Sequence, residues 1–141
     1  MVWKVLGYEH TELVVINGDL ISGYGTTSNN ASDYVDQVVA PIVEKDLLWA
    51  STYGNHDNEY YIHSEDVLKK EQSYPNSLTQ KMVSHPSAGV SNYYLPVYPA
   101  SESQDIPELI LWFFDSRGGR EADYVHDSVF LAFFFFRYFG I

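Results

Sequence analysis

The sequence predicts an α/β fold whose first half contains two parallel strands, and three observations lead to this class. A continuous apolar, β-branched run over residues 13–16 is typical of a strand buried on both faces. An amphipathic helical pattern follows, and a second apolar run occupies residues 47–53. Strand, helix and strand in this order form a βαβ unit, so we expect the two strands to be parallel neighbours with a right-handed crossover.

The helix of this unit is expected after a loop over residues 22–32 that is rich in glycine, serine, threonine and asparagine. Ser32 can serve as its N-cap, with Asp33 and Asp36 in the first turn. Apolar residues then recur at helical spacing and predict one buried face: Val35, Val38, Val39, Ile42 and Val43. Pro41 lies inside this pattern and predicts a kink or an early end of the helix.

Further elements are expected in the second half of the chain. Residues 64–72 predict a second helix, and residues 73–91, which prolines interrupt, predict a loop. Residues 92–95 predict a short strand, which Pro96 should end or confine to the edge of a sheet. Residues 108–114 predict another strand, and because it is apolar almost throughout we expect it to be central in its sheet.

The composition narrows the classes of protein to which this chain can belong. Hydrophobic residues make up 45% of its 141 residues, which suits a globular domain and argues against wholesale disorder. The chain has 8 basic and 19 acidic residues, and this net charge of -11 disfavours binding to nucleic acid. The longest apolar run, residues 129–136, is too short to span a bilayer. The absence of cysteine excludes disulfides, thiolate catalysis and iron–sulfur clusters, and it leaves the compartment open.

Polar residues follow three of the predicted strands at their carboxyl ends: Asn17-Gly18-Asp19, Gly54-Asn55-His56-Asp57 and Asp115-Ser116. Ligands of open α/β sheets bind beyond these ends. Parallel order of the first two strands would bring Asp19 and residues 55–57 to one edge of the sheet, within reach of each other. Two plainer interpretations stay open. Asn17-Gly18 is also a hairpin-turn signal, and Gly54-Asn55 can be a turn that solvated polar residues follow.

The residue types at this edge suit metal-assisted acid–base chemistry. The two carboxylate oxygens of Asp19 can bridge two cations, and the side-chain oxygen of Asn55 can ligate one of them. His56 can act as a general acid near neutral pH. Asp57 can accept the other ring N–H and so set the tautomer of that histidine. A bound metal would also attract an anionic substrate to an otherwise acidic protein.

This order of motifs, Gly-Asp after one buried strand and Gly-Asn-His-Asp after the next, resembles the calcineurin-like metallophosphoesterases. Residues 73–80, 89–95 and 111–118 resemble the purple-acid-phosphatase-like branch of fungi and plants. The resemblance covers most of the chain. It implies an incomplete β-sandwich flanked by helices, in a four-layer α/β/β/α order, of which residues 1–129 would form the central part. Residues 130–141 would be an atypical, phenylalanine-rich tail.

The resemblance implies a hydrolase that acts on phosphate esters with a dinuclear metal centre. In the family, the residue at the position of Asp19 bridges the two metals, and the residue at the position of Asn55 ligates one. The residue at the position of His56 contacts the phosphate and protonates the leaving oxygen, and the residue at Asp57 orients that histidine. Manganese, zinc or iron are the expected metals. A phosphorylated protein or small molecule is the expected substrate.

The chain departs from the family at both ends of this series of motifs. No Asp-x-His precedes Asp19 and no Gly-His-x-His follows Asp115, so two of roughly seven expected ligands are present. We therefore expect marginal folding, poor retention of metal, and weak or no hydrolysis by the chain alone. Ser22 replaces the tyrosine of true purple acid phosphatases, which disfavours a coloured iron–tyrosinate centre. The other histidines are expected at the surface: His10, His63, His85 and His126.

Two other functions stay open. The chain could be a non-catalytic α/β module that binds a partner, since its 12 Tyr, 8 Phe and 3 Trp would suit an interface where they are exposed. Such a module would not need Asp19, Asn55 or His56. Alternatively, the sequence could come from an incorrectly assigned reading frame, because the phenylalanine-rich tail has neither a helix cap nor a polar face.

Overall fold

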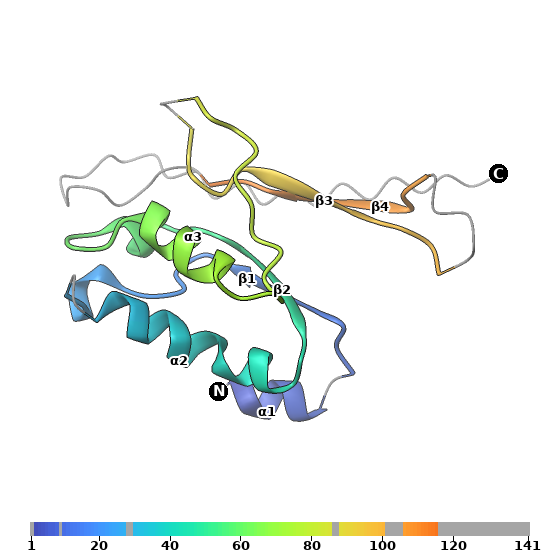
Figure 1. Ribbon diagram of the computed structural model, residues 1–141, viewed down its shortest axis with the longest axis horizontal. Helices are drawn as coiled ribbons and strands as arrows, with labels where there is room; N and C mark the ends of the chain where they lie inside the picture. Colours follow the sequence, from blue (N-terminus) through green and yellow to red (C-terminus); the bar gives the residue numbers. More distant parts are fainter. Residues whose placement is uncertain (1, 9, 28–29, 86–87, 101–105, 116–141) are drawn as a thin grey trace.

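The computed structural model describes residues 2–8, 10–27, 30–85, 88–100 and 106–115 of the chain. In chain order its elements are helix α1 (Val2–Tyr8), strand β1 (Leu13–Asn17), the 3-10 turn η1 (Gly23–Gly25), helix α2 (Ala31–Glu44), strand β2 (Leu48–Thr52), the 3-10 turn η2 (His56–Asn58), helix α3 (Ser64–Gln72), and strands β3 (Tyr93–Val97) and β4 (Leu109–Phe113). Helices and strands alternate through the first part of the chain, which confirms the α/β class (Figure 1).

The strand–helix–strand unit predicted from the sequence is present. Strand β1 pairs in parallel with β2, with Leu13 opposite Leu48 and Asn17 opposite Thr52. Helix α2 connects them and buries Val35, Val39 and Ile42 of the apolar face that its helical spacing predicts. Val43, which was expected on that face, is exposed near the end of the helix. Helix α3 covers residues 64–72, the range expected for it. The predictions for this half of the molecule are therefore confirmed in element type, order and pairing.

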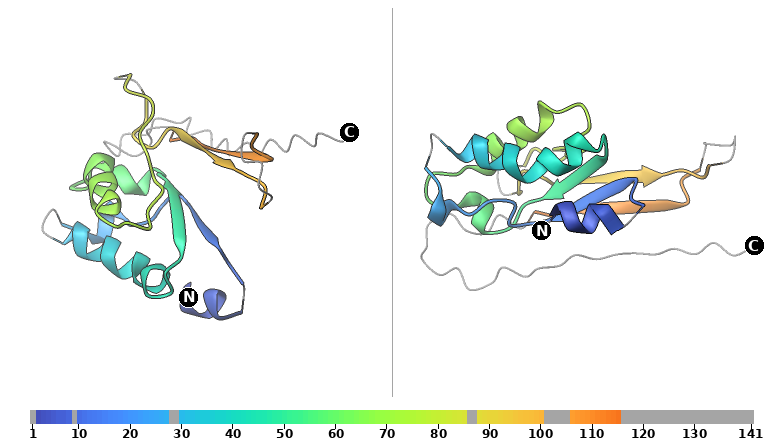
Figure 2. Two further views of the ribbon diagram at one scale, coloured as in Figure 1. Left: turned by 45° about the vertical axis from the view of Figure 1, so that its right-hand side comes forward. Right: turned by 90° about the horizontal axis from the view of Figure 1, so that it is seen from below.

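The described elements lie in three layers (Figures 1 and 2). Helices α2 and α3 cover one face of the β1–β2 sheet, and the β3–β4 sheet lies on the other face. Alternate side chains of β2 and of the residue after it point to the two sides. Trp49 and Tyr53 join the cluster under the helices, while Ala50 packs with Tyr93 and Phe113 of the second sheet. The second helical layer of a four-layer sandwich stays a prediction.

Helix α2 differs from its prediction at both ends. It starts at Ala31 with Asn30 as N-cap, not with Ser32, and the side chain of Asn30 accepts the N–H of Thr27 at 2.7 Å instead of capping the helix. It also continues past Pro41 to Glu44, so the predicted early end is wrong. A proline lacks one N–H donor, and a single missing hydrogen bond near the end of a helix is tolerated when the ring is buried, as it is here.

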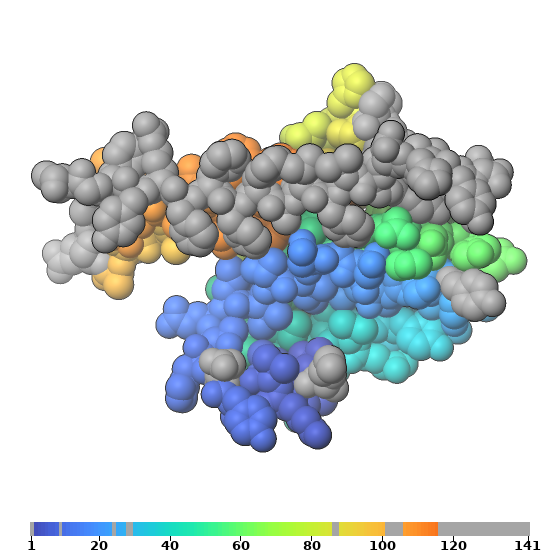
Figure 3. All heavy atoms as spheres, turned by 180° about the vertical axis from the view of Figure 1, so that it is seen from behind, coloured from blue at the N-terminus to red at the C-terminus, as the bar shows by residue number. Residues whose placement is uncertain are grey.

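The periphery holds the other differences. Helix α1 was not expected from the sequence; it has 7 residues, of which only Leu6 is buried, and it packs beside the C-terminal end of α2 (Figures 1 and 3). Strand β3 continues through Pro96 to Val97, where it still pairs with β4. Among the described residues β4 pairs only with β3, so its predicted central position is wrong there. An apolar run predicts a strand, but it does not show that two neighbours flank it, and the outer side chains of β4, Ile110 and Trp112, are exposed.

No helix in the described part of the chain is both long and apolar enough to cross a membrane. The apolar run at 129–136 and the whole phenylalanine-rich tail at 130–141 lie outside the described residues. The division of the chain into residues 1–129 and 130–141 therefore stays a prediction.

Candidate functional site

The loops that follow β1 and β2 meet at the carboxyl edge of their sheet. The N–H of Gly18 donates to the carbonyl of Thr52 at 3.1 Å, and the N–H of His56 donates to Oδ1 of Asp19 at 3.2 Å. The expected juxtaposition of Asp19 with residues 55–57 is thus confirmed. The alternative of a hairpin at Asn17-Gly18 is wrong, because β1 pairs in parallel with β2 across a helix.

Two glycines allow Asp19 to lie this close to the second loop. Gly18 has a φ of +79°, and a Cβ there would lie 3.1 Å from the backbone nitrogen of Gly54. A Cβ on Gly54 would lie 2.2 Å from Oδ1 of Asp19, so only glycine leaves room for the carboxylate. Asp19 itself has a φ of +53°, a left-handed conformation that costs roughly 1–2 kcal/mol outside glycine. Such strain is typical of functional positions.

Asp57 ties the two loops together from inside the protein. Its carboxylate is fully buried and accepts the N–H of Ile21 and the N–H of Gly54, each at 2.9 Å. Burial raises the pKa of Asp57 to about 6, although the two hydrogen bonds act in the opposite direction. Both carboxylate oxygens are therefore occupied by backbone donors. The expectation that Asp57 accepts the ring N–H of His56 is not met.

The ring of His56 pairs instead with Glu59, which the sequence analysis did not single out. The Nδ1 atom of His56 lies 2.7 Å from Oε2 of Glu59, and the imidazole is half exposed. This hydrogen bond raises the pKa of His56, with a smaller contribution from the charges of Asp19 and Asp57, while partial burial opposes it. The sequence signal for this pair was that His56 and Glu59 are three positions apart, because side chains at i and i+3 of a 3-10 turn lie on one side.

Asn55 begins the η2 turn with helical backbone angles, φ −68° and ψ −33°. Its carbonyl accepts the N–H of Asn58 at 3.3 Å, and its side chain makes no capping hydrogen bond to the turn. The side-chain oxygen is therefore not committed to the cap. Together with the carboxylate of Asp19 it offers hard oxygen ligands of the kind that metal ions of phosphatases accept.

The described residues do not on their own form a complete metal site. No group of three or more histidine, aspartate or glutamate side chains is placed to hold a metal ion in the part of the chain that the structure describes. Asp19 and Asn55 contribute one carboxylate and one amide, whereas a two-metal centre of this kind needs more ligands. The observed donors therefore do not fit a dinuclear centre without further ligands.

The carboxylate of Glu71 in α3 binds side chains at the end of β2. This fully buried carboxylate accepts hydrogen bonds from the indole N–H of Trp49 at 3.3 Å, the hydroxyl of Ser51 at 2.5 Å and the hydroxyl of Tyr53 at 2.6 Å. These residues alternate along one face of the strand, so a single carboxylate holds three successive inward side chains. Burial raises the pKa of Glu71, and the hydrogen bonds partly offset this effect. The sequence pattern does not reveal the burial of Glu71, because its hydrogen-bond partners are distant in sequence.

The third predicted strand end joins the same edge of the molecule. The hydroxyl of Thr52 donates to the carbonyl of Phe114 at 2.8 Å, which places the ends of β2 and β4 side by side. Asp115 uses Oδ2 to accept the N–H groups of Val90 and Ser91, at 2.7 and 3.3 Å. Asp115 therefore holds the loop before β3, and Ser116 lies outside the described residues.

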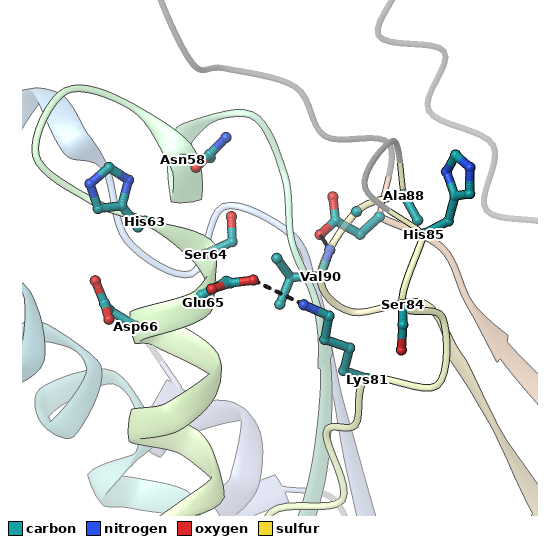
Figure 4. Close-up of a pocket in the computed structure, with 12 residues that line it drawn as sticks. Asn58, His63, Ser64, Glu65, Asp66, Lys81, Ser84, His85, Ala88 and Val90 are labelled. Atoms are coloured by element: carbon teal, nitrogen blue, oxygen red, sulfur yellow. Dashed lines mark hydrogen bonds and ion pairs between the residues drawn. The ribbon is translucent and has the colours of Figure 1, made fainter.

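A polar cavity of about 510 Å³ lies between η2, the start of α3 and the loop before β3 (Figure 4). Its charged wall includes Lys81 and Glu65, whose side chains form an ion pair at 2.9 Å, drawn as a dashed line in Figure 4. Asn58 and Asp115 also line it, so the cavity borders both the η2 turn and the end of β4.

The remaining predictions for single residues have simple outcomes. His10, His63 and His85 are exposed, as expected, and His126 lies outside the described residues. Ser22 is the exposed N-cap of η1. None of these side chains belongs to the Asp19–His56 edge.

Comparison with known proteins identifies relatives that are named as purple acid phosphatases or as a phosphatase. The chain is 31% identical over 120 residues to "Probable inactive purple acid phosphatase 29" of Arabidopsis thaliana, which covers 80% of this chain and 30% of that protein. It is 33% identical over 100 residues to "Probable inactive purple acid phosphatase 14" of the same plant, covering 67% of this chain and 24% of that protein. It is 29% identical over 119 residues to "Phosphatase DCR2" of Saccharomyces cerevisiae, covering 82% and 20%.

The chain thus spans less than a third of the length of these relatives. No protein-family model matches it, and no solved structure matches it. Four of the matching relatives nevertheless carry names of purple acid phosphatases or of a phosphatase. The chain belongs to the purple-acid-phosphatase-like branch of the metallophosphoesterases.

Proposed function

We propose that this chain carries the substrate-facing edge of a metal-dependent phosphoesterase, a hydrolase of phosphate esters. One observation carries the proposal. The N–H of His56 donates to the carboxylate of Asp19 across 37 positions of sequence, so that a ligand-type carboxylate and an acid–base histidine share one sheet edge. The names of the relatives, which are phosphatases or inactive purple acid phosphatases, support the same reaction class.

Each residue of the edge has a proposed role. Asp19 and Asn55 act as metal ligands through their side-chain oxygens. His56 contacts the phosphate and protonates the leaving oxygen, for which its raised pKa is suited because the ring stays protonated to higher pH. Asp57 acts by holding the two loops together through Ile21 and Gly54. The substrate is a phosphorylated protein or small molecule.

The described donors limit what the chain alone can do. Two oxygen ligands do not retain two ions of manganese, zinc or iron, and an acidic protein without bound cations repels phosphate. We therefore expect the isolated chain to hydrolyse phosphate esters weakly or not at all. The described residues do not complete a metal site, so the roles given above are those of the protein side chains alone.

Calorimetric titration of the chain with Mn²⁺ tests the proposal through metal binding and does not require turnover. We expect weak binding that Asp19→Asn reduces at least several-fold, because the variant removes the carboxylate proposed as a metal ligand, whereas both oxygens of Asp57 already accept backbone donors. Asp33→Asn, which changes an exposed aspartate of α2, is the matched control for the loss of one charge. Equal Mn²⁺ affinity of the native chain and Asp19→Asn would contradict the proposal.

Hydrolysis of p-nitrophenyl phosphate with added Mn²⁺ is the second measurement. Turnover near the blank is expected for the chain alone. Robust turnover that Asp19→Asn abolishes would show that the chain completes its metal site, and our expectation of weak activity would be wrong.

A non-catalytic binding module is the second candidate, because a row of aromatic side chains is exposed on the outer face of the β3–β4 sheet: Tyr94, Trp112 and Phe114. Exposed aromatic groups of this kind are enriched at protein interfaces. Three relatives also carry names that describe them as probable inactive purple acid phosphatases. Such a module would show no difference in Mn²⁺ binding between the native chain and Asp19→Asn.

A further inference from the structure

We propose that Glu59 is the positioning residue that sets the tautomer and the orientation of the His56 ring, in the place expected of Asp57. The Nδ1 atom of His56 lies 2.7 Å from Oε2 of Glu59. His56 is the first residue of η2 and Glu59 is its C-cap, three positions later, so their side chains lie on one side of the turn. The carboxylate is the more enclosed partner: the Glu59 side chain is 18% exposed and that of His56 46%.

The backbone of Glu59 is anchored from a second direction by η1. A Cβ on Gly23 would lie 2.3 Å from the carbonyl oxygen of Glu59 and 2.6 Å from its Cβ, so this contact is possible only with glycine. The carbonyl of Glu59 also accepts the N–H of Ile62 at 2.9 Å. Two contacts therefore fix the residue whose carboxylate meets the imidazole, although its side chain lies near the surface.

Asp57 is not available for the same role. Its two carboxylate oxygens accept the N–H groups of Ile21 and Gly54, each at 2.9 Å, and the side chain is fully buried. A rotation toward the ring would leave buried backbone donors without partners, which costs about 1–3 kcal/mol for each group. The two acidic residues of the turn thus divide the work: Asp57 holds the loop and Glu59 holds the ring.

The chemical consequence concerns the second ring nitrogen. With the Nδ1 proton donated to Glu59, Nε2 is the nitrogen that exchanges a proton with a ligand. In the proposed reaction the proton leaves Nε2 for the leaving oxygen of the ester, and the imidazolium becomes a neutral imidazole whose remaining proton stays on Nδ1, hydrogen-bonded to the Glu59 carboxylate. This consequence rests on the proposed function, whereas the tautomer itself does not.

Ring ¹⁵N resonances of the full chain, recorded without metal or substrate at a pH where the imidazole is neutral, test the assignment. His56→Asn identifies the resonances of this histidine. We expect the native ring to carry its proton on Nδ1. Glu59→Ala should move it toward the Nε2–H tautomer that a free imidazole prefers, and Glu59→Gln, which keeps an acceptor oxygen, should restore the native pattern. Gly23→Ala should act like Glu59→Ala because it displaces the backbone of Glu59.

Two further variants separate this role from its alternatives. Asp57→Asn should leave the tautomer unchanged, since Asp57 bonds backbone groups. Asp66→Ala removes another exposed carboxylate that pairs with a cation three residues away, Lys69 at 3.4 Å, and should also have no effect. An unchanged ring in Glu59→Ala, or an equal change in Asp57→Asn or Asp66→Ala, would overturn the proposal. A negative phosphatase assay would leave the ring measurement untouched, so the two proposals fail separately.

Discussion

The two faces of the molecule use apolar strands in opposite ways. On the face that α2 and α3 cover, the inward side chains of β2 are buried and their polar atoms end on the carboxylate of Glu71. On the outer face of the β3–β4 sheet, the rings of Tyr94, Trp112 and Phe114 are 41%, 46% and 50% exposed. The ring of Trp112 lies beside those of Tyr94 and Phe114, with centroids 5.3 and 6.2 Å apart. Both regions have apolar strands, so hydrophobicity does not distinguish the covered strand β2 from the exposed face of the β3–β4 sheet. The difference lies in the hydrogen bonds that the side chains of β2 make to Glu71.

Replacement of Glu71 should have the largest effect on this comparison. Glu71→Ala leaves the buried donors of Trp49, Ser51 and Tyr53 without their acceptor, and we expect a loss of about 3 kcal/mol or more in the free energy of unfolding. Glu71→Gln keeps one acceptor oxygen and should lose less. Urea unfolding followed by tryptophan fluorescence measures both. A loss below about 1 kcal/mol in Glu71→Ala would mean that burial alone holds the helical layer on β2.

The pH dependence of stability should give a smaller effect, through the buried carboxylate of Asp57 that joins the loops after β1 and β2. Burial raises the pKa of Asp57 from its ordinary 3.8 to about 6. A carboxyl group with a raised folded-state pKa contributes stability that is fully present below pH 3.8 and is lost as the pH rises through about 6. The total corresponds to about 3 kcal/mol, of which about 2 kcal/mol falls between pH 4.5 and 7.

Asp57→Asn isolates this contribution from the other carboxylates. The variant cannot ionise at this position, so its stability relative to the native chain should improve by about 2 kcal/mol between pH 4.5 and 7. Urea midpoints of both proteins at several pH values provide the comparison. A difference that stays constant over this range would mean that the two hydrogen bonds from Ile21 and Gly54 outweigh burial.

The sequence predicted what depends on short-range pattern. The apolar runs and helical spacing predicted the βαβ unit, and the range of α3 was predicted without error. The approach of Asp19 to His56 also followed, because parallel pairing brings the carboxyl ends of two strands to one edge. Helix α1 was missed because 7 residues with one buried position carry no periodic signal.

What the sequence did not predict depends on distant partners. Glu71 has the composition of an exposed helical residue, and only its contacts with β2, 18 to 22 positions away, explain its burial. Glu59 reaches His56 because η2 is a 3-10 turn, which the tetrapeptide motif does not specify. The prediction that β4 is central in its sheet was wrong among the described residues for a related reason. An apolar run does not specify which elements lie beside the strand.

The smallest effect on stability is expected on the outer face. Trp112→Ala removes a ring that is 46% exposed and lies beside the rings of Tyr94 and Phe114, so the free energy of unfolding should change by about 1 kcal/mol or less. Phe113, the next residue, is its matched control. It points inward, is 5% exposed and stacks on Tyr93 with centroids 4.4 Å apart, so Phe113→Ala should cost about 3 kcal/mol or more.

The same pair of variants also separates stability from association. Because exposed apolar patches promote contacts between molecules, Trp112→Ala should reduce self-association at high concentration, measured by sedimentation velocity, while the fold persists. Phe113→Ala should increase self-association because it loosens the inner face. If instead Trp112→Ala destabilised the chain as much as Phe113→Ala, the outer face would be part of the core. The contrast between a covered and an uncovered apolar sheet would then no longer distinguish the two halves of the molecule.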